Sequence, residues 1–209
     1  MMHHEGFFCG IRNEKIYYQY WQPGKPIILI GHSMGGLIGA AYLIDHQDEV
    51  HGAVLSGPSV KAPDHVPKIL ILAGNVLSAL LPGFGLIQLD AKGVCRDPEV
   101  VKAYVDDPLV CTGKITARLS VELHKAMQRV ITKAAEIVLP ILIVQGGSDE
   151  LVDPKGARLL YNSVGSTDKT IKIYDGLYHE VFNEPEHELV MDDIQKWVEA
   201  HLDSRPPVS

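Results

Sequence analysis

A glycine–serine turn between an apolar segment and an amphipathic segment constrains this chain more than any other feature. Residues 31–35, Gly-His-Ser-Met-Gly, fit the pattern G-x-S-x-G and directly follow the continuous apolar run of residues 27–30. Such a run is typical of a strand buried on both faces, and residues 37–45 carry an apolar stripe with helical spacing. A sharp turn from a buried strand into a helix indicates a fold in which parallel strands alternate with helices.

Further short apolar runs predict the rest of the sheet. Residues 53–56, 141–144 and 170–174 have the composition of strands, and helical patterns separate them. Residues 7–12 and 15–21 predict an antiparallel hairpin, the second of them through an aromatic run that strands favour. We therefore expect an α/β fold with a mainly parallel sheet of about six strands and an N-terminal antiparallel hairpin.

The segment between the second and third parallel strands predicts helices and no convincing strand. The three helical stretches are residues 64–81, 97–105 and 116–136. Asp97 is expected to cap the second of these, with Pro98 in its first turn. An all-helical insertion of this kind would lie over the carboxyl edge of the sheet, where open α/β sheets bind ligands. We assign residues 1–57 and 138–209 to a core and residues 58–137 to a helical cap.

Composition limits the partners of such a domain. The 209-residue chain is 46% hydrophobic and can bury one core, while its net charge of −7 and scattered basic residues predict no nucleic-acid interface. The most apolar stretch, residues 69–81, has about 13 residues against the roughly 20 that span a bilayer. We expect this stretch to contact a lipid surface or to cover an apolar pocket.

Cysteine usage and the start of the chain predict the compartment. Three cysteines without C-x-x-C spacing indicate neither a disulfide framework nor a zinc site. The first residues show no basic region followed by an apolar stretch, so no secretory signal is expected. Both features predict a cytoplasmic protein.

The serine of the turn needs a base, because a serine hydroxyl is a weak nucleophile at neutral pH. In α/β folds that use such a turn, the acid and the base follow the serine in the order Ser, Asp or Glu, His, each after a later strand. Asp149 follows the strand at residues 141–144, and His179 follows the strand at residues 170–174. We therefore predict Ser33 as nucleophile, His179 as general base and Asp149 as the residue that orients the base.

Each of these assignments has an alternative. Residues 31–35 could form a structural turn only, and Glu150 or Asp153 could replace Asp149, which could itself be a solvated or helix-capping carboxylate. His32 adjoins the serine but is fixed by the turn backbone, so we expect it to pack rather than to react. The other histidines are expected to be ordinary surface residues: His3, His4, His46, His51, His65, His124, His187 and His201.

Together these motifs resemble the monoacylglycerol lipase and lysophospholipase group of the α/β-hydrolase superfamily. The matching stretches are residues 31–36, 145–149 with 151–154, and 178–184, and the resemblance runs over most of the chain. It implies an α/β-hydrolase fold and hydrolysis of a monoacylglycerol or similar short-to-medium acyl ester through an acyl-serine intermediate. It implies no metal and no organic cofactor, and an oxyanion hole to which the Met34 amide contributes.

The chain departs from this group before the serine turn. Members normally place two further strand–helix units there, roughly 60 residues at about 30 each, including a His-Gly loop that donates one oxyanion amide. Here five residues separate Trp21 from Ile27, so that loop is missing. Only the Met34 amide can be carried over as a donor. Loss of one oxyanion donor typically costs about 10²–10³ in turnover.

The short connection has two predicted consequences. Residues 15–21 should run antiparallel beside residues 27–30, which would bring Asn13 near the serine as a second oxyanion donor. An ordinary turn asparagine is the alternative for Asn13. Apolar surface left by the missing units could also drive formation of a homodimer.

Three functions stay open from the sequence. The first is ester hydrolysis. The second is thioester hydrolysis or acyl transfer on the same scaffold, because fold does not fix the reaction. The third is a catalytically weak or inactive lipid-binding or scaffold protein that keeps Ser33, Asp149 and His179.

Overall fold

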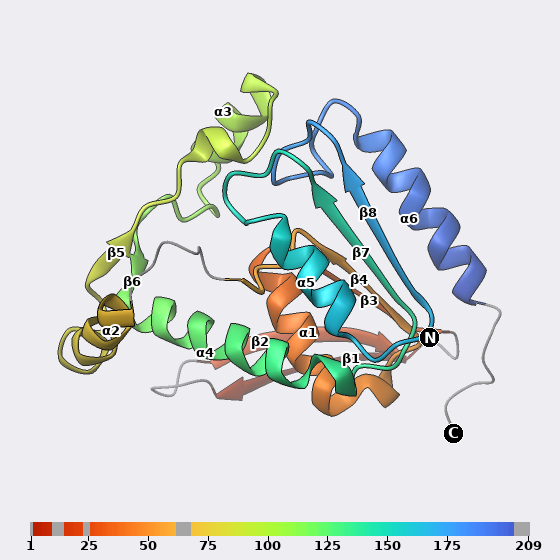
Figure 1. Cartoon of the computed structure of the whole chain (residues 1–209), viewed down its shortest axis with the longest axis horizontal. Helices are drawn as coiled ribbons and strands as arrows, with labels where there is room; N and C mark the ends of the chain where they lie inside the picture. Colours follow the sequence, from red (N-terminus) through yellow and green to blue (C-terminus); the bar gives the residue numbers. More distant parts are fainter. Residues whose placement is uncertain (1, 10–14, 23–25, 62–67, 203–209) are drawn as a thin grey trace.

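A four-stranded parallel sheet lies at the centre of the computed structural model, which describes residues 2–9, 15–22, 26–61 and 68–202. Its strands are β3 (Ile28–His32), β4 (Gly52–Ser56), β7 (Ile141–Gly146) and β8 (Lys169–Tyr174), side by side in that order (Figure 1). All three pairings between these strands are parallel, as the apolar runs separated by helices predicted.

Helices cover both faces of this sheet (Figure 1). One face carries α1 (Met34–His46), α4 (Ala117–Lys133) and α5 (Lys155–Ser163), and the other carries α6 (His187–Leu202). Side chains alternate accordingly along the two central strands: Ala53, Leu55, Ile141 and Ile143 join the first core, and Val54, Leu142 and Val144 join the second. Central strands that are buried on both faces therefore need continuous apolar runs.

β3 is an edge strand, which the sequence did not predict. It pairs with β4 alone among the described strands. Ile30 is 58% exposed and Ile27, just before the strand, is 41% exposed, so the expectation of a strand buried on both faces was wrong here. The apolar composition is that of a central strand, whereas no described strand lies beyond β3 to bury it.

An N-terminal antiparallel hairpin is present, but its first strand covers residues 2–9 rather than the predicted 7–12. β1 (Met2–Cys9) pairs antiparallel with β2 (Lys15–Gln22) in a sheet of its own. The expected pairing of β2 with β3 does not occur. The connection between the two strands contains Pro23 and Pro26, and proline has no N–H to donate to a strand pair.

The segment between β4 and β7 is mostly helical. It contains α2 (Lys68–Leu80), α3 (Pro98–Asp106) and α4, and the Asp97 side chain accepts a hydrogen bond from the Glu99 amide at 2.9 Å. This confirms the predicted cap at the start of α3. The segment is not all helical, however, because β5 (Gly85–Ile87) pairs antiparallel with β6 (Ile115–Thr116). Strands of three and two residues are too short to show a period-two pattern.

The C-terminal half of α4 packs against the core. Val130 is buried in the same cluster as Leu37 and Leu43 of α1, and Arg129 binds the Asp45 carboxylate. The division into a core and a cap at residues 58–137 stays a prediction. Among the described residues, no helix has the length and apolar character needed to cross a membrane.

Candidate active site

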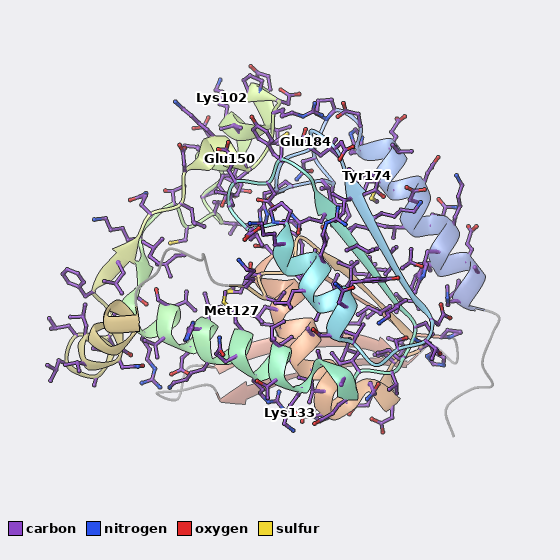
Figure 2. All side chains as sticks on the ribbon, in the orientation of Figure 1. Lys102, Met127, Lys133, Glu150, Tyr174 and Glu184 are labelled. Carbon is purple, nitrogen blue, oxygen red and sulfur yellow. The ribbon has the colours of Figure 1, made fainter. Side chains whose placement is uncertain are left out.

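The loops after β3, β7 and β8 reach the same edge of the sheet, the edge at which α3 lies (Figure 1). Figure 2 shows Glu150 and Glu184 near this edge, whereas Lys133 lies near the opposite end of the molecule. Ser33 directly follows β3, Asp149 follows β7 and His179 follows β8. The parallel strands therefore bring all three predicted residues to one region.

Ser33 has a strained backbone. Its φ of 54° and ψ of −117° make it the one non-glycine residue with positive φ in the described part of the chain. The Ser33 amide donates to the Ser56 carbonyl at 2.8 Å, and the Ser33 carbonyl accepts from the Leu37 and Ser59 amides, each at 3.2 Å. Strain of this kind persists only where surrounding contacts fix it, and it is concentrated at functional sites.

The glycines of the turn leave room for this conformation. A Cβ on Gly31 would lie 2.5 Å from the Gly35 carbonyl oxygen, and a Cβ on Gly36 would lie 3.0 Å from Cα of Pro58. Both approaches are to backbone atoms, which cannot rotate away as a side chain can. The G-x-S-x-G spacing followed by a further glycine therefore has a steric cause in this structure.

Asp149 and His179 form a buried pair. Nδ1 of His179 lies 2.7 Å from Oδ2 of Asp149, and the two side chains are 7% and 0% exposed. Oδ2 also accepts a hydrogen bond from Nε2 of Gln145 at 2.8 Å, while Oδ1 accepts from the Leu151 and Val152 amides, each at 2.9 Å. Four donors thus hold the carboxylate in one orientation, and the carboxylate in turn holds the imidazole.

The two competing carboxylates have other surroundings. Glu150 is exposed, and Asp153 pairs with Lys61 at 2.7 Å. Of the three carboxylates on this loop, Asp149 alone contacts His179 among the described residues.

His32 packs against His179, as its place in the turn suggested. The two ring centroids are 4.7 Å apart, and Nδ1 of His32 lies 3.1 Å from Oγ of Ser56. Burial, together with the neighbouring His179, lowers the pKa of His32 below its ordinary value. His32, the residue before Ser33, therefore lies against the imidazole of His179. The Ser33 hydroxyl and the His179 ring are not hydrogen-bonded to each other in the structure, and such bonds often form only when substrate is bound.

The structure describes one of the two predicted oxyanion donors, Met34. Met34 is the first residue of α1, and amides in a first helical turn have no acceptor within the helix. The positive end of the helix dipole adds to the attraction for an anion there. Asn13 lies outside the described residues.

A cavity of about 450 Å³ lies in the segment between β4 and β7, and the sequence did not predict it. Its largely apolar lining includes Leu89, Val94, Tyr104, Val105, Cys111 and Ile115. The Val94 carbonyl accepts a hydrogen bond from the Glu180 amide at 2.7 Å, which joins the cavity wall to the His179 loop. The lining residues come from three separate stretches of the chain, so no local sequence signal marks the cavity. In the described part of the chain, no group of histidine, cysteine or acidic residues could hold a metal ion.

The model of the serine aminopeptidase S33 family matches residues 14–186. The chain belongs to this family. Membership confirms the resemblance to the α/β-hydrolases, and the parallel sheet with helices on both faces agrees with the predicted α/β-hydrolase fold.

Relatives in the family include enzymes named as lipases. The chain is 46% identical over 180 residues to a monoacylglycerol lipase of Mycolicibacterium smegmatis and 37% identical over 179 residues to the human monoglyceride lipase. These matches cover 86% and 84% of this chain but 64% and 59% of the relatives. The chain therefore spans less than two thirds of their length.

Solved structures of lipases have folds similar to that of this chain. The monoacylglycerol lipase of Paleococcus ferrophilus is similar with a TM-score of 0.77 at 29% identity, covering 90% of this chain and 84% of that one. A monoglyceride lipase of Saccharomyces cerevisiae, solved in complex with a substrate analog, gives a TM-score of 0.75 at 25% identity, covering 86% and 63%. The fold is thus shared with these two lipases as far as the matched regions extend.

Proposed function

We propose that this chain is a serine hydrolase that cleaves monoacylglycerols or similar short-to-medium acyl esters through an acyl-serine intermediate. The observation that carries the proposal is the buried Asp149–His179 pair, 2.7 Å apart, at the sheet edge where Ser33 has its strained backbone. The resemblance to relatives named monoacylglycerol lipase supports the choice of substrate class.

In the proposed reaction, the Ser33 hydroxyl attacks the ester carbonyl while Nε2 of His179 accepts the hydroxyl proton. Asp149 accepts a hydrogen bond from Nδ1–H and so keeps Nε2 free of a proton beforehand. The oxyanion that forms faces the Met34 amide at the start of α1. His179 then donates the proton to the leaving alcohol, and the acyl group stays on Ser33. His179 then accepts a proton from water, which attacks the acyl-serine; the same proton passes to Oγ of Ser33 as the fatty acid leaves.

The cavity supports an acyl ester as substrate. Its apolar lining suits a hydrocarbon chain, and Val94 links it to the loop of His179. Apolar side chains at least 40% exposed also gather near the end of α2 and along β5: Val76, Leu80, Leu81, Phe84, Leu86 and Ile87. Such a surface supports transient contact with a lipid surface, from which an acyl ester could be taken up.

A second candidate function is lipid binding without effective turnover. The short connection before β3 favours it, because the missing His-Gly loop leaves Met34 as the one donor carried over. Asn13 remains our proposed second donor. A phosphonate bound to Ser33 whose oxygen contacts Met34 alone would contradict the role of Asn13, as would full activity of Asn13→Ala. Thioester hydrolysis or acyl transfer would use the same residues on a different acyl donor or acceptor.

The test of the proposed function compares wild-type protein with Ser33→Ala. We expect wild-type protein to hydrolyse p-nitrophenyl butyrate and octanoate and a monoacylglycerol, and Ser33→Ala to lose this activity. A fluorophosphonate should label wild-type protein at Ser33, as located by mass spectrometry of peptides, because labelling needs an activated serine. Binding of fatty acid with neither labelling nor Ser33-dependent hydrolysis would favour the lipid-binding function instead.

We also propose a homodimer and a cytoplasmic location. The exposed apolar side chains of the edge strand β3 support the dimer, since Ile30 is 58% exposed. Light scattering that finds only the 23.0 kDa monomer would contradict it. Cys95 and Cys111 are free thiols in the structure, which supports a reducing compartment.

A further inference from the structure

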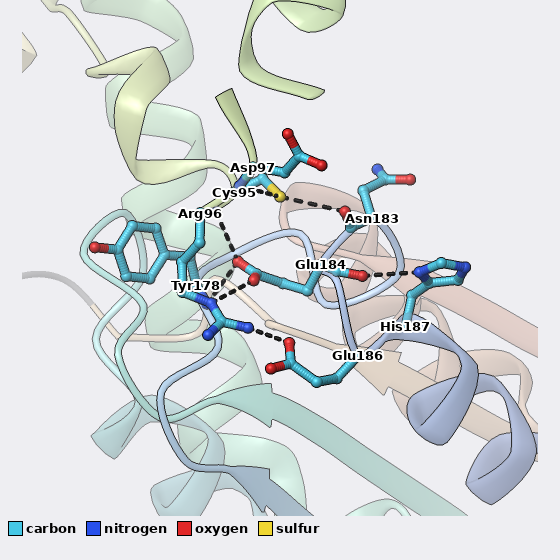
Figure 3. Close-up of polar contacts among 8 residues, drawn as sticks. All are labelled: Cys95, Arg96, Asp97, Tyr178, Asn183, Glu184, Glu186 and His187. Atoms are coloured by element: carbon cyan, nitrogen blue, oxygen red, sulfur yellow. Dashed lines mark hydrogen bonds and ion pairs between the residues drawn. The ribbon is translucent and has the colours of Figure 1, made fainter. Parts of the chain in front are cut away.

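A buried ion pair joins the loop of His179 to the segment between β4 and β7 (Figure 3). Glu184 lies between β8 and α6, and its side chain is fully buried. Its Oε2 accepts a hydrogen bond from Nε of Arg96 at 2.6 Å, and its Oε1 accepts one from the Arg96 amide at 3.0 Å. Arg96 lies just before α3, so the pair connects residues 88 positions apart.

The same carboxylate fixes the backbone next to His179. Oε1 of Glu184 also accepts a hydrogen bond from the Tyr178 amide at 3.0 Å (Figure 3). On the other side of His179, the Glu180 amide donates to the Val94 carbonyl at 2.7 Å. The residues before and after His179 are therefore both held, directly or through Glu184, by residues 94–96.

The burial of Glu184 makes this connection specific. A buried carboxylate is stable only when donors satisfy its oxygens, and here three N–H groups do so. The side-chain hydrogen bond from Arg96 to Glu184 raises the pKa of Arg96 further, so the guanidinium stays charged. Glu186 also binds Arg96, but it is 48% exposed and contacts only the outer guanidinium nitrogen. Glu186 is therefore a matched comparison for Glu184 on the same arginine.

We propose that Glu184 is a positioning residue for His179 and that, through Arg96, it couples the orientation of His179 to residues 94–96. The inference rests on the proposed function, in which His179 is the base. Asp149 holds the imidazole ring, while Glu184 holds the backbone that carries it. Val94 lines the cavity, so an acyl chain that displaces this wall also shifts the backbone on both sides of His179. Occupation of the cavity and alignment of the base are thereby linked.

The experiment compares Glu184→Gln and Arg96→Lys with the control Glu186→Gln in the full chain. Glutamine keeps the shape of Glu184 but replaces one acceptor oxygen with a donor. We expect kcat for a p-nitrophenyl ester, per Ser33 labelled by fluorophosphonate, to fall about 10- to 100-fold in Glu184→Gln, because a displacement of about 1 Å can cost 10²-fold. KM should stay within about twofold, because neither Glu184 nor Arg96 lines the cavity. Arg96→Lys keeps the charge but loses the planar set of guanidinium donors, so its kcat should lie between those of Glu184→Gln and wild type. The kcat of Glu186→Gln should stay within about twofold of wild type.

A second measurement does not depend on turnover. In protein labelled with ¹⁵N-histidine, Glu184→Gln should shift the signal of the His179 Nδ1–H proton, assigned through its loss in His179→Gln, while Glu186→Gln should leave it in place. If Glu184 only stabilised the fold, Glu184→Gln would lower Tm and the labelled fraction but change neither kcat per labelled site nor this signal. That result overturns the proposal, as do equal losses in Glu184→Gln and Glu186→Gln.

The design separates the failure of this proposal from the failure of the proposed function. Wild-type protein without Ser33-dependent hydrolysis would contradict the proposed function, and the ¹⁵N comparison would still decide whether Glu184 positions His179. If Glu184→Gln does not fold, Arg96→Lys decides, with an unchanged kcat and an unchanged His179 signal counting against the proposal.

Discussion

Replacement of Asp149 with asparagine tests the proposed triad directly, because the contacts of this carboxylate predict how asparagine would be accommodated. The Leu151 and Val152 amides point at Oδ1 and cannot reorient, so the asparagine oxygen should take that position. The amide nitrogen then occupies the position of Oδ2, where Gln145 and His179 now donate.

Both of these neighbours can adapt to a donor. Oε1 of Gln145 is buried without a hydrogen-bond partner among the described residues, so a flip of the Gln145 amide lets it accept from asparagine. His179 can accept at Nδ1 only if its proton moves to Nε2. Asp149→Asn should therefore fold with nearly unchanged stability while it holds His179 in the tautomer that cannot take the Ser33 proton.

The expected loss is about 10⁴-fold in kcat, as for a base held in the wrong tautomer, which corresponds to about 5 kcal/mol of transition-state stabilisation. Hydrolysis of p-nitrophenyl butyrate and thermal unfolding, measured together, separate this loss from unfolding. Glu150→Gln and Asp153→Asn are the controls, because those carboxylates do not contact His179, and both should stay within about threefold of wild type. Retention of more than a tenth of kcat in Asp149→Asn, or an equal loss in Asp153→Asn, would refute the assignment.

Two further predictions follow from the structure. Gly57 has a φ of 49°, and a Cβ there would lie 3.3 Å from Nδ1 and Cε1 of His179. Gly57→Ala should therefore cost about 1–2 kcal/mol of stability through its left-handed backbone, measured by urea unfolding, and should reduce kcat for ester hydrolysis by displacing the imidazole. An unchanged kcat would mean that the ring tolerates the contact. Lys172 donates to Asp193 and lowers the pKa of that carboxyl below its ordinary value of 3.8. The contribution of this ion pair to the stability of the fold is therefore fully present above pH 3.8 and is lost as the pH falls through the lower folded-state pKa. Tm should therefore fall less steeply below about pH 4 in Asp193→Asn than in wild type or in the exposed neighbour Asp192→Asn, and parallel curves for all three proteins would contradict this.

Local signals in the sequence predicted the four strands of the parallel sheet and the start of α3. The central strands β4 and β7 are continuous apolar runs because helices cover both of their faces, and Asp97 caps α3 through a hydrogen bond two residues away. The pairing of Asp149 with His179 also followed from the chain, since residues after successive parallel strands must reach the same edge. Each of these features depends on short-range pattern or on chain order.

Features that depend on distant partners could not be predicted. Glu184 is fully buried although charged residues are almost never buried unless paired, and its partner Arg96 is 88 residues away. The exposure of Ile30 depends on what lies beyond β3, which the apolar run itself does not encode. For the same reason, β5 and β6 pair across about 30 residues without a pattern that either segment shows alone.

The position of β3 at the edge of the sheet explains why the two parts of the proposed site differ. From β3 the sheet extends in one direction, through β4 and β7 to β8, and this side supplies Asp149 and His179. The Ser33 turn depends on that side too, because its amide donates to the carbonyl of Ser56, the last residue of β4, and its carbonyl accepts from the Ser59 amide. The His-Gly loop that the resemblance implies would belong to the other side, where no described strand pairs with β3. In the proposed site, loss of strand–helix units on that side of the sheet would therefore leave Ser33, Asp149 and His179 at one edge while it removed an oxyanion donor. If the proposed ester hydrolysis occurs, its rate would report how well the first turn of α1, with the residues next to it, stabilises the oxyanion without that loop.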